Sequence, residues 1–453
     1  MRSPGVARGA RADWSALAVA AILLGGLGLY ALVYIVARSH MPIDADGQGY
    51  YAYLPAYLVD HDLTFNTVIR QHILPTYAAA HLPAQQFGFS LQPTGAWLDK
   101  YGVGVAVLLL PFFLAGHGLA LALGLHADGY TRIETLVSGA AAVVYVALGL
   151  WCLRAVLRRW FSSGVTAIVL VLFTLGTGVV NYFAWAPAFS HDFTVFAVSA
   201  MLLTALRWYE RPSSWWRAAL LGLAMGAVVA IRLTNVVLLA AVPLLLMGGP
   251  AAVRVRAALI ARHAAQAGVA VTCALLCLLP QVATWYVATG HLITRPYPGE
   301  SFDFAHPRLL ESLVWLQPHG LLPYYPVMAL AIAGLCVAWV RRRDLALPVT
   351  LTLLLFWYVS SSWWDWSFSD GFGDRAYIDV VPLAALPAAL LLQSLGNRVV
   401  RRGVVAAGGV LAVVTCVLLL AYWQRALPQD GIDAAGYLHV LTHPQQLLHA
   451  PRG

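Results

Sequence analysis

The sequence predicts an all-α integral membrane fold with about eleven transmembrane helices. Hydrophobic residues make up 60% of the 453 residues and charged residues only 11%, whereas a soluble globular protein carries roughly 25% charged residues. Apolar runs long enough to cross a bilayer, which takes ~20 helical residues, recur along the chain. Arginine clusters lie between these runs and account for the net charge of +8. Such clusters mark the cytoplasmic side of a membrane protein. A soluble enzyme and a nucleic-acid-binding domain are therefore excluded.

The first apolar run, residues 14–36, is expected to be an uncleaved transmembrane span. Arg2, Arg8 and Arg11 precede it, which places the N-terminus inside and the following residues outside. The run is too long for a signal peptide and has no small-residue cleavage site before polar sequence begins. Residues 37–101 then form a first extracytoplasmic loop.

Ten more crossings complete the predicted topology. They are expected at residues 131–153, 165–181, 188–207, 216–233, 234–247, 266–288, 323–340, 346–361, 377–395 and 403–423. The run at 102–125 is not expected to cross, because Pro111 and the Gly116-His117-Gly118 sequence favour a re-entrant or membrane-lying pair of short helices. The spans at 216–233 and 234–247 are expected to meet at a polar turn that begins at Arg232.

With this count, every interior arginine cluster lies on the cytoplasmic side. The clusters are Arg154/Arg158/Arg159, Arg207/Arg211/Arg217, Arg254/Arg256/Arg262, Arg341/Arg342/Arg343 and Arg398/Arg401/Arg402. A twelve-span count places the first of them outside and breaks the positive-inside rule. We interpret residues 1–423 as one polytopic domain, and residues 424–453 as an extracytoplasmic tail too short to form its own core.

The predicted topology places nearly all of the acidic residues outside. Of the twenty acids, only Asp13, Glu210 and Asp344 fall on the cytoplasmic side. Acids contribute little to topology, so this asymmetry indicates that the chemistry takes place on the outer face.

An acidic and tyrosine-rich stretch opens the first outer loop. Asp44 and Asp46 precede a helix that is expected to start near Gly49 and lie along the membrane. A carboxylate at this position can act as a general base towards a hydroxyl, although an aspartate before a helix also commonly caps it. The tyrosines of this helix suit the headgroup layer and are candidates for substrate binding; they include Tyr50, Tyr51 and Tyr53.

Basic residues occur at three further positions where a phosphate can bind. Lys100, the only lysine beside twenty-seven arginines, lies where the outer loop re-enters the membrane. It can hold a lipid phosphate as a point charge, or it can be a snorkelling interfacial lysine. Arg232 lies inside apolar sequence, which makes it a functional candidate by default, with a structural ion pair as the alternative.

Arg375 lies in the loop at 362–379, which is rich in tryptophan and glycine. An arginine fork beside indole rings suits a phosphate-linked sugar, although an interfacial aromatic belt with an Arg–Asp pair is the simpler alternative. The candidate sugar contacts in this loop are Trp363, Trp364, Asp365 and Trp366.

No cofactor is predicted. Two aspartates in a D-x-D pattern can ligate a divalent cation, but no further ligands accompany them, so we assign no metal site.

With these residues located, the chain resembles bacterial members of the GT-C superfamily. These are polytopic glycosyltransferases related to protein O-mannosyltransferases and to the aminoarabinose transferase of lipid A. The resemblance covers most of the chain and is carried by four motifs. The motifs are the acidic loop with Gly49-Tyr50-Tyr51-Ala52-Tyr53-Leu54-Pro55, Lys100-Tyr101-x-x-Gly104 with Pro111-Phe112-Phe113, Arg232-x-Thr234-Asn235, and Phe372-Gly373-x-Arg375.

The resemblance implies membrane-parallel helices in the first outer loop, with Asp46, or its rival Asp44, as the catalytic base. It further implies a polyprenyl-phosphate-linked sugar as donor, with Lys100 and Arg375, and more speculatively Arg232, on the lipid phosphate. In-line attack by an acceptor hydroxyl inverts the anomeric centre. The implied location is the inner membrane of a bacterium, with the active site facing the periplasm. The acceptor stays open between lipid, glycan and protein. D-A-D replaces the adjacent Asp-Glu pair of protein O-mannosyltransferases, which argues against a protein acceptor.

Two other functions fit the same aromatic and basic residues. A transporter or flippase of lipid-linked sugars needs these residues, but such proteins tend to carry midplane charges and internal repeats, and we detect no such repeats here. A non-catalytic binder of isoprenoid glycolipid needs Lys100 and Arg375 but no acid.

Overall fold

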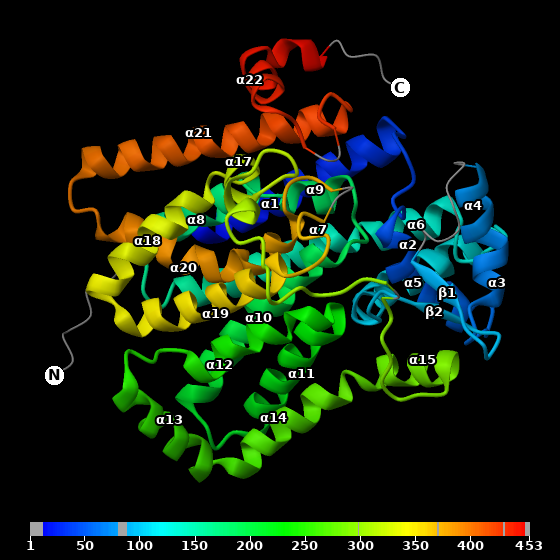
Figure 1. Ribbon diagram of the computed structural model, residues 1–453, viewed down its shortest axis with the longest axis horizontal. Helices are drawn as coiled ribbons and strands as arrows, with labels where there is room; N and C mark the ends of the chain where they lie inside the picture. Colours follow the sequence, from blue (N-terminus) through cyan, green and yellow to red (C-terminus); the bar gives the residue numbers. More distant parts are fainter. Residues whose placement is uncertain (1–11, 80–87, 298, 369–370, 429–430, 449–453) are drawn as a thin grey trace.

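The computed structural model describes residues 12–79, 88–297, 299–368, 371–428 and 431–448, which fold almost entirely into helices (Figure 1). The elements before residue 160 are α1 (Trp14–Ala31), η1 (Leu32–Val36), α2 (Asp46–Leu58), α3 (Asn66–Val68), η2 (Ile69–Ile73), α4 (Leu74–Ala79), β1 (Phe89–Leu91), β2 (Trp97–Asp99), α5 (Gly104–Ala122), α6 (Arg132–Gly139) and α7 (Ala141–Leu157). The strands β1 and β2 pair antiparallel as a hairpin.

The middle and C-terminal parts of the chain add further helices. From residue 163 to 314 they are α8 (Ser163–Leu175), α9 (Val179–Ala184), α10 (Ser190–Glu210), α11 (Trp215–Ile231), η4 (Leu233–Ala240), α12 (Ala241–Leu244), α13 (Pro250–Arg262), α14 (Ala264–Leu276), α15 (Leu279–Thr289) and α16 (Glu311–Val314). The remaining ones are α17 (Leu321–Tyr324), α18 (Met328–Arg341), α19 (Arg343–Ser361), η5 (Arg375–Val380), α20 (Val381–Ser394), α21 (Arg398–Trp423), α22 (Ala434–Thr442) and η6 (Pro444–Leu448).

The predicted all-α membrane fold is confirmed. In the described part of the chain, seven helical segments are long and apolar enough to cross a bilayer, and shorter apolar helices accompany them. The seven are Trp14–Val36, Gly104–Ala122, Arg132–Leu157, Ala264–Thr289, Arg343–Ser361, Arg375–Ser394 and Arg398–Trp423. The number of crossings, eleven, stays a prediction.

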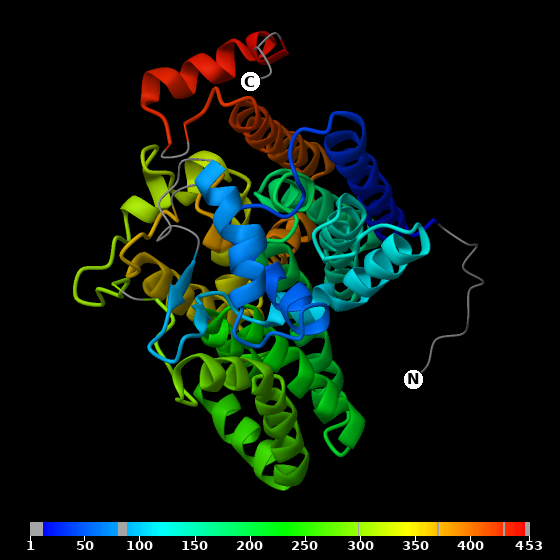
Figure 2. The same ribbon diagram turned by 90° about the vertical axis from the view of Figure 1, so that its right-hand side faces the viewer.

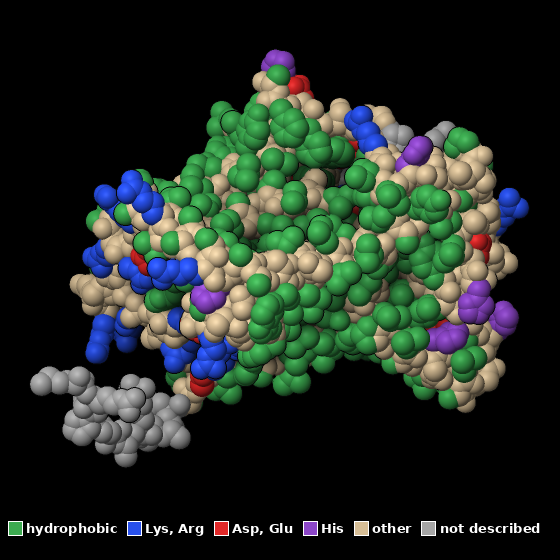
Figure 3. Space-filling view, turned by 90° about the horizontal axis from the view of Figure 1, so that it is seen from below, with side chains coloured by type: hydrophobic (Ala, Val, Ile, Leu, Met, Phe, Trp, Pro, Cys, Tyr) green, Lys and Arg blue, Asp and Glu red, His purple; other side chains and the backbone are tan. Residues whose placement is uncertain are grey.

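Ion pairs join the arginine clusters at one end of the molecule. Each acid that the predicted topology places on the cytoplasmic side has an arginine partner there. The pairs are Asp13 with Arg154, Glu210 with Arg159 and Arg217, and Asp344 with Arg342. Most of the Lys and Arg side chains visible in Figure 3 gather at its left-hand end, and an apolar band lies beside them. Figure 2 views the opposite end, over which α2, α3, α4 and the hairpin are gathered.

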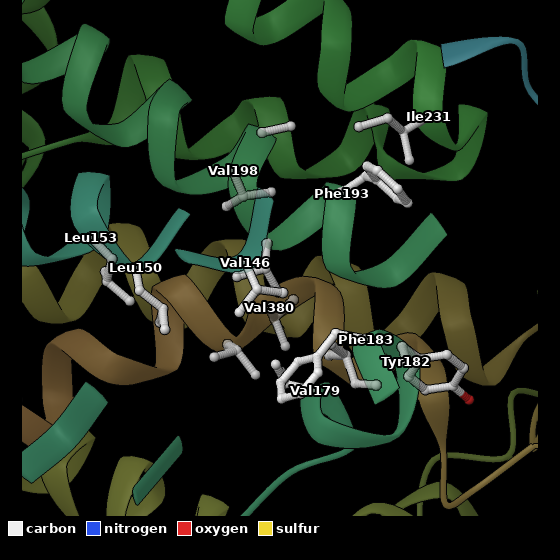
Figure 4. Close-up of a cluster of buried hydrophobic side chains, with 14 of the residues drawn as sticks. Val146, Leu150, Leu153, Val179, Tyr182, Phe183, Phe193, Val198, Ile231 and Val380 are labelled. Carbon is white, nitrogen blue, oxygen red and sulfur yellow. The ribbon is translucent and has the colours of Figure 1, made fainter. Parts of the chain in front are cut away.

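Small residues and apolar side chains hold the spans together. A Cβ atom on Gly149 of α7 would lie 2.8 Å from the backbone of Phe196 in α10, and one on Gly222 of α11 would lie 2.1 Å from the Ala270 carbonyl oxygen in α14. Close backbone approach of this kind is how membrane helices gain packing contacts. Figure 4 shows the resulting core, in which side chains from α7, α9, α10, α11 and η5 cluster.

Two expectations for the first loop are corrected. The helix α2 begins at Asp46 rather than near Gly49, so Asp46 lies in its first turn. Its tyrosines are not at a headgroup surface, because Tyr50, Tyr51 and Tyr53 are all buried. The hydroxyl of Tyr51 donates to the Gly129 carbonyl, and that of Tyr53 donates to the Tyr101 carbonyl at 2.7 Å. These bonds satisfy the polar tips inside the protein.

The segment 102–125 holds one continuous helix, α5, and not the expected pair of short helices. His117 is bound to the buried Glu134 of α6 at 2.6 Å, and Gly116 leaves room for the backbone of the same residue. Gly116 therefore serves helix packing instead of a break. The segment after α5 contacts α2 again, because Gly129 lies against Pro55.

The close contact between the start of α5 and the end of α11 yields a prediction for stability. A Cβ atom on Gly104 would lie 2.4 Å from the Ala230 carbonyl carbon, whereas one on Gly118 of the same helix would meet nothing within 4 Å. We expect Gly104→Ala to lower the free energy of unfolding by about 1–3 kcal/mol, as overpacking does. Gly118→Ala, the control, should be neutral or should stabilise by up to about 1 kcal/mol. Thermal unfolding of both variants in detergent measures the change in stability. Equal melting temperatures for the two variants would contradict the close contact between α5 and α11.

Candidate functional site

The glycines of the D-G-Q-G sequence determine how Asp46 is held. A Cβ atom on Gly49 would lie 2.0 Å from the ring of Tyr101, so this residue allows the ring to lie against α2. From there the Tyr101 hydroxyl donates a hydrogen bond to Asp46 Oδ1 at 2.7 Å. The Tyr50 ring packs on the same tyrosine, with ring centroids 4.8 Å apart.

Arg375, from the start of η5, supplies the counter-charge. Its Nη1 lies 3.1 Å from Asp46 Oδ2, with side chains 13% and 29% exposed, respectively. Burial raises the pKa of the Asp46 carboxyl, but the Arg375 guanidinium, the Tyr101 hydroxyl and the Lys100 ammonium together lower it below its usual value. Asp46 is therefore an ionised carboxylate at neutral pH.

Lys100 follows directly after strand β2 and points towards the loop that precedes α16. Its Nζ lies 3.3 Å from Glu300 Oε1 and 5.7 Å from the centroid of the Tyr297 ring. The second carboxylate oxygen of Glu300 accepts a hydrogen bond from Trp364 Nε1 at 3.3 Å. Glu300 thus joins the only lysine of the sequence to the tryptophan-rich loop.

Arg232 lies in the polar turn where α11 ends. Its backbone is extended, with φ −147° and ψ 120°, before η4 begins at Leu233. Nη1 of Arg232 lies 3.4 Å from Asp379 Oδ2, and its guanidinium lies over the Phe368 ring, 5.2 Å from the centroid. The Arg375 guanidinium lies 5.9 Å from the centroid of the same ring, so Phe368 is placed beside both arginines.

One cavity of about 330 Å³ brings these side chains together. Of the residues that the sequence singled out, its lining includes Asp46, Tyr50, Lys100, Arg232, Trp363, Trp364, Asp365 and Arg375. Further aromatic lining comes from Phe189, Tyr297, Phe302 and Phe368. The cavity therefore combines three cations, the three acids Asp46, Glu300 and Asp365, and aromatic walls. Cations beside aromatic rings suit a ligand with an anionic group and a polar ring.

Four candidate residues lie elsewhere. Asp44 is exposed, accepts a hydrogen bond from the Ala45 backbone, and lines a second cavity beside η1 and the end of α21. Tyr51 and Tyr53 are tied to backbone carbonyls as described above. Trp366 is buried against Trp315, with ring centroids 6.3 Å apart. The structure thus separates Asp44 from the cavity that contains Asp46.

The sequence reasoning missed several residues in and behind the cavity wall. It gave no role to Glu300, His191 and Tyr101, which line the cavity, or to Asp379, which lies behind the lining. A signal existed for Asp379, because it is an acid inside an apolar run. For Glu300 no local pattern marks its pairing with Lys100, which is distant in sequence.

Within the described ranges, no group of three or more His, Cys, Asp or Glu side chains lies close enough to hold a metal ion. The D-A-D pattern also directs its two carboxylates to different cavities.

No protein-family model matches the sequence, and no curated protein is significantly similar to it. Solved structures do match. ArnT from Cupriavidus metallidurans in the apo state aligns with a TM-score of 0.51 and 14% identity, over 97% of this chain and 74% of that one. The same protein bound to undecaprenyl phosphate aligns with a TM-score of 0.50 and 15% identity, over 96% and 76%.

The chain shares its fold with ArnT. This confirms the fold that the resemblance drawn from the sequence motifs implied. Together with the apolar helices, the shared fold makes this chain a multi-pass membrane protein.

The depressed pKa of Asp46 leads to a prediction about stability and pH. A carboxylate whose pKa is lower in the folded state stabilises the fold above its unfolded pKa, about 3.9, and loses this effect as pH falls through the folded value. We expect Asp46→Asn to lower the free energy of unfolding by about 1–3 kcal/mol at neutral pH. The gap in melting temperature from wild type should stay constant between pH 5 and 8 and narrow only below about pH 4.

Asp44→Asn is the matched control, because Asp44 is exposed and has no cation partner among the described residues. It should leave the melting temperature nearly unchanged across the same pH range. A larger effect for Asp44→Asn than for Asp46→Asn would contradict the ion pair with Arg375.

Proposed function

We propose that this protein is a membrane glycosyltransferase that moves a sugar from a polyprenyl-phosphate-linked donor to an acceptor hydroxyl. The observation that carries the proposal is the convergence of Asp46, Lys100, Arg232 and Arg375 in one cavity with aromatic walls. Clustered cations suit recognition of a phosphate. A base beside them can take the proton of the acceptor hydroxyl during sugar transfer. The fold shared with ArnT, which was crystallised with undecaprenyl phosphate, supports a polyprenyl lipid as the donor's carrier.

In the proposed reaction each wall of the cavity has a separate role. Lys100, Arg375 and Arg232 bind the donor phosphate and stabilise its charge as it leaves. Indole rings of Trp363 and Trp364 bind the sugar, with Asp365 and Tyr50 beside them. The acceptor oxygen bonds to the anomeric carbon while the bond from that carbon to the phosphate oxygen breaks, and Asp46 takes the hydroxyl proton. Attack from the side opposite the leaving phosphate inverts the anomeric centre.

Asp46 and the phosphate share a partner in this scheme, because Arg375 pairs with the carboxylate at 3.1 Å. A phosphate that draws Arg375 towards itself weakens the ion pair and raises the pKa of Asp46, whose basicity then increases. Donor binding is therefore coupled to activation of the base. We further propose that the site faces the periplasm from a bacterial inner membrane, with a lipid, glycan or protein as acceptor.

Replacement of the base tests this proposal directly. With a panel of polyprenyl-phosphate sugars, we expect Asp46→Asn to lower the rate of sugar transfer or donor hydrolysis by about 10²–10⁴-fold, the usual effect of losing a general base. Binding of undecaprenyl phosphate should be retained, because the amide leaves Arg375 free for the phosphate. Radiolabelled sugar release measures the rate, in the presence and absence of a chelator.

Asp44→Asn is again the control and should transfer sugar at the wild-type rate. Equal turnover by wild type and Asp46→Asn would remove Asp46 as the base. Donor binding without turnover in any variant would instead favour a carrier or a non-catalytic binder of lipid-linked sugars. Loss of turnover with chelator, restored by a divalent cation, would add a metal to the mechanism.

The pairing of Lys100 with Glu300 makes a separate prediction about affinity. Glu300→Gln keeps the size of the side chain but removes the carboxylate that competes with phosphate for the Lys100 ammonium. We expect the Kd for undecaprenyl phosphate to fall by about two- to fivefold, in line with the strength of a partly exposed ion pair. Glu311→Gln is the control, because Glu311 pairs with Arg308 and does not line the cavity. A higher Kd for Glu300→Gln than for wild type would contradict the competition between Glu300 and the phosphate for Lys100.

A further inference from the structure

Asp379 is the centre of a buried polar network on one wall of the cavity. Its side chain is fully buried, and it accepts contacts from residues of other spans. His191 Nδ1 lies 2.9 Å from Asp379 Oδ1, while Asn235 Nδ2 at 2.9 Å and Arg232 Nη1 at 3.4 Å both meet Oδ2. All three partners of Asp379 line the cavity, whereas Asp379 itself is not part of the lining.

The network joins three parts of the chain that are distant in sequence. His191 lies in the first turn of α10, Arg232 and Asn235 lie at the break after α11, and Asp379 lies in η5. A carboxylate inside an apolar span is costly unless it is paired and hydrogen-bonded. Contacts from three side chains to the two carboxylate oxygens meet this need, so all three side chains share one fully buried partner.

The two acids that pair with cavity cations other than Arg375 differ in burial. The Glu300 side chain is 22% exposed and belongs to a loop, so it can turn away when a phosphate approaches Lys100. The Asp379 side chain is 0% exposed and is held by contacts from α10 and η4. A guanidinium has five N–H donors, so Arg232 can keep one on Asp379 and present others to the cavity.

We propose that Asp379 is a positioning residue that orients Arg232, through a network shared with His191 and Asn235, for binding the phosphate of a lipid. This inference rests on the proposed function, because it assigns Arg232 to that phosphate. Asp379 acts through Arg232 and does not touch the ligand. Removing the Asp379 carboxylate frees the Arg232 guanidinium from its ion pair, but the guanidinium is then no longer oriented. The Asn235 and His191 side chains also lose their acceptor.

A double-mutant cycle on lipid binding tests the inference. The probe is undecaprenyl phosphate, titrated onto purified protein in detergent, with wild type, Asp379→Asn, Arg232→Gln and the double variant. We expect each single change to raise the Kd by about tenfold, and the double variant to bind no worse than Arg232→Gln alone. Because Asp379 acts only by orienting Arg232, its replacement has nothing left to affect once the guanidinium is gone.

Two further variants separate positioning from loss of structure. Asp192→Asn replaces another buried carboxylate, which lies on α10 next to His191 and has no hydrogen-bond partner in the described residues. It should bind the lipid as wild type does. Asp379→Glu, which restores the charge, should bind more tightly than Asp379→Asn.

The outcomes distinguish the inference from the function on which it rests. A double variant whose Kd rises by the product of the single effects, about a hundredfold, would overturn the role of Asp379. So would an Asp379→Asn variant that binds as well as wild type, or as tightly as Glu300→Gln. No lipid-phosphate binding by wild type would overturn the proposed function and this inference together. Binding with the expected cycle but no turnover would retain Asp379 and reject only the transferase.

Discussion

The ion pair between Asp46 and Arg375 connects the two halves of the chain from which the cavity is built. Asp46 opens the first helix of the outer loop, and Arg375 opens η5, more than three hundred residues later. Each of these side chains is mostly buried, and a lone charge at such a depth costs several kcal/mol. The pair therefore defines how α2 sits on the membrane spans. Tyr101 adds a hydrogen bond to the same carboxylate, and the neighbouring Lys100 lines the cavity.

A helix that carries so many buried groups needs room as well as charge. Gly47 and Gly49 supply this room, because a Cβ atom on them would meet Ala188 at 2.9 Å and Tyr101 at 2.0 Å. These glycines are two residues apart and lie on different sides of α2, so the helix approaches the loop before α10 on one side and the segment before α5 on the other. The D-G-Q-G sequence works as a unit, in which the aspartate is the functional group and the glycines allow its partners to approach.

The sequence carries enough information to place the cavity's charges but not their partners. Arginine clusters and apolar runs are local patterns, so the helical membrane fold and the two ends of the molecule follow from them. Asp46, Lys100, Arg232 and Arg375 are each conspicuous because charge is rare in this chain. Their joining in one cavity depends on how spans pack, which no local pattern records. Tyr51 and Tyr53 show the same limit, because a tyrosine suited to the headgroup layer is equally suited to a core position where a backbone carbonyl accepts from its hydroxyl.

Every cation of the cavity has an acidic partner already. Lys100 pairs with Glu300, Arg232 with Asp379, and Arg375 with Asp46. In the proposed function, a phosphate therefore competes with these acids for their cations, and the burial of each acid determines whether it can give up its cation. Glu300 belongs to a partly exposed loop and can leave for solvent. Asp379 is enclosed and keeps Arg232 in place. Asp46 lies at the cavity wall. When Arg375 binds the phosphate in the proposed reaction, the Asp46 carboxylate loses part of its counter-charge, and this carboxylate must then take up the proton. In the proposed reaction, a single arginine shared between base and phosphate thus makes Asp46 a stronger base once the donor is bound.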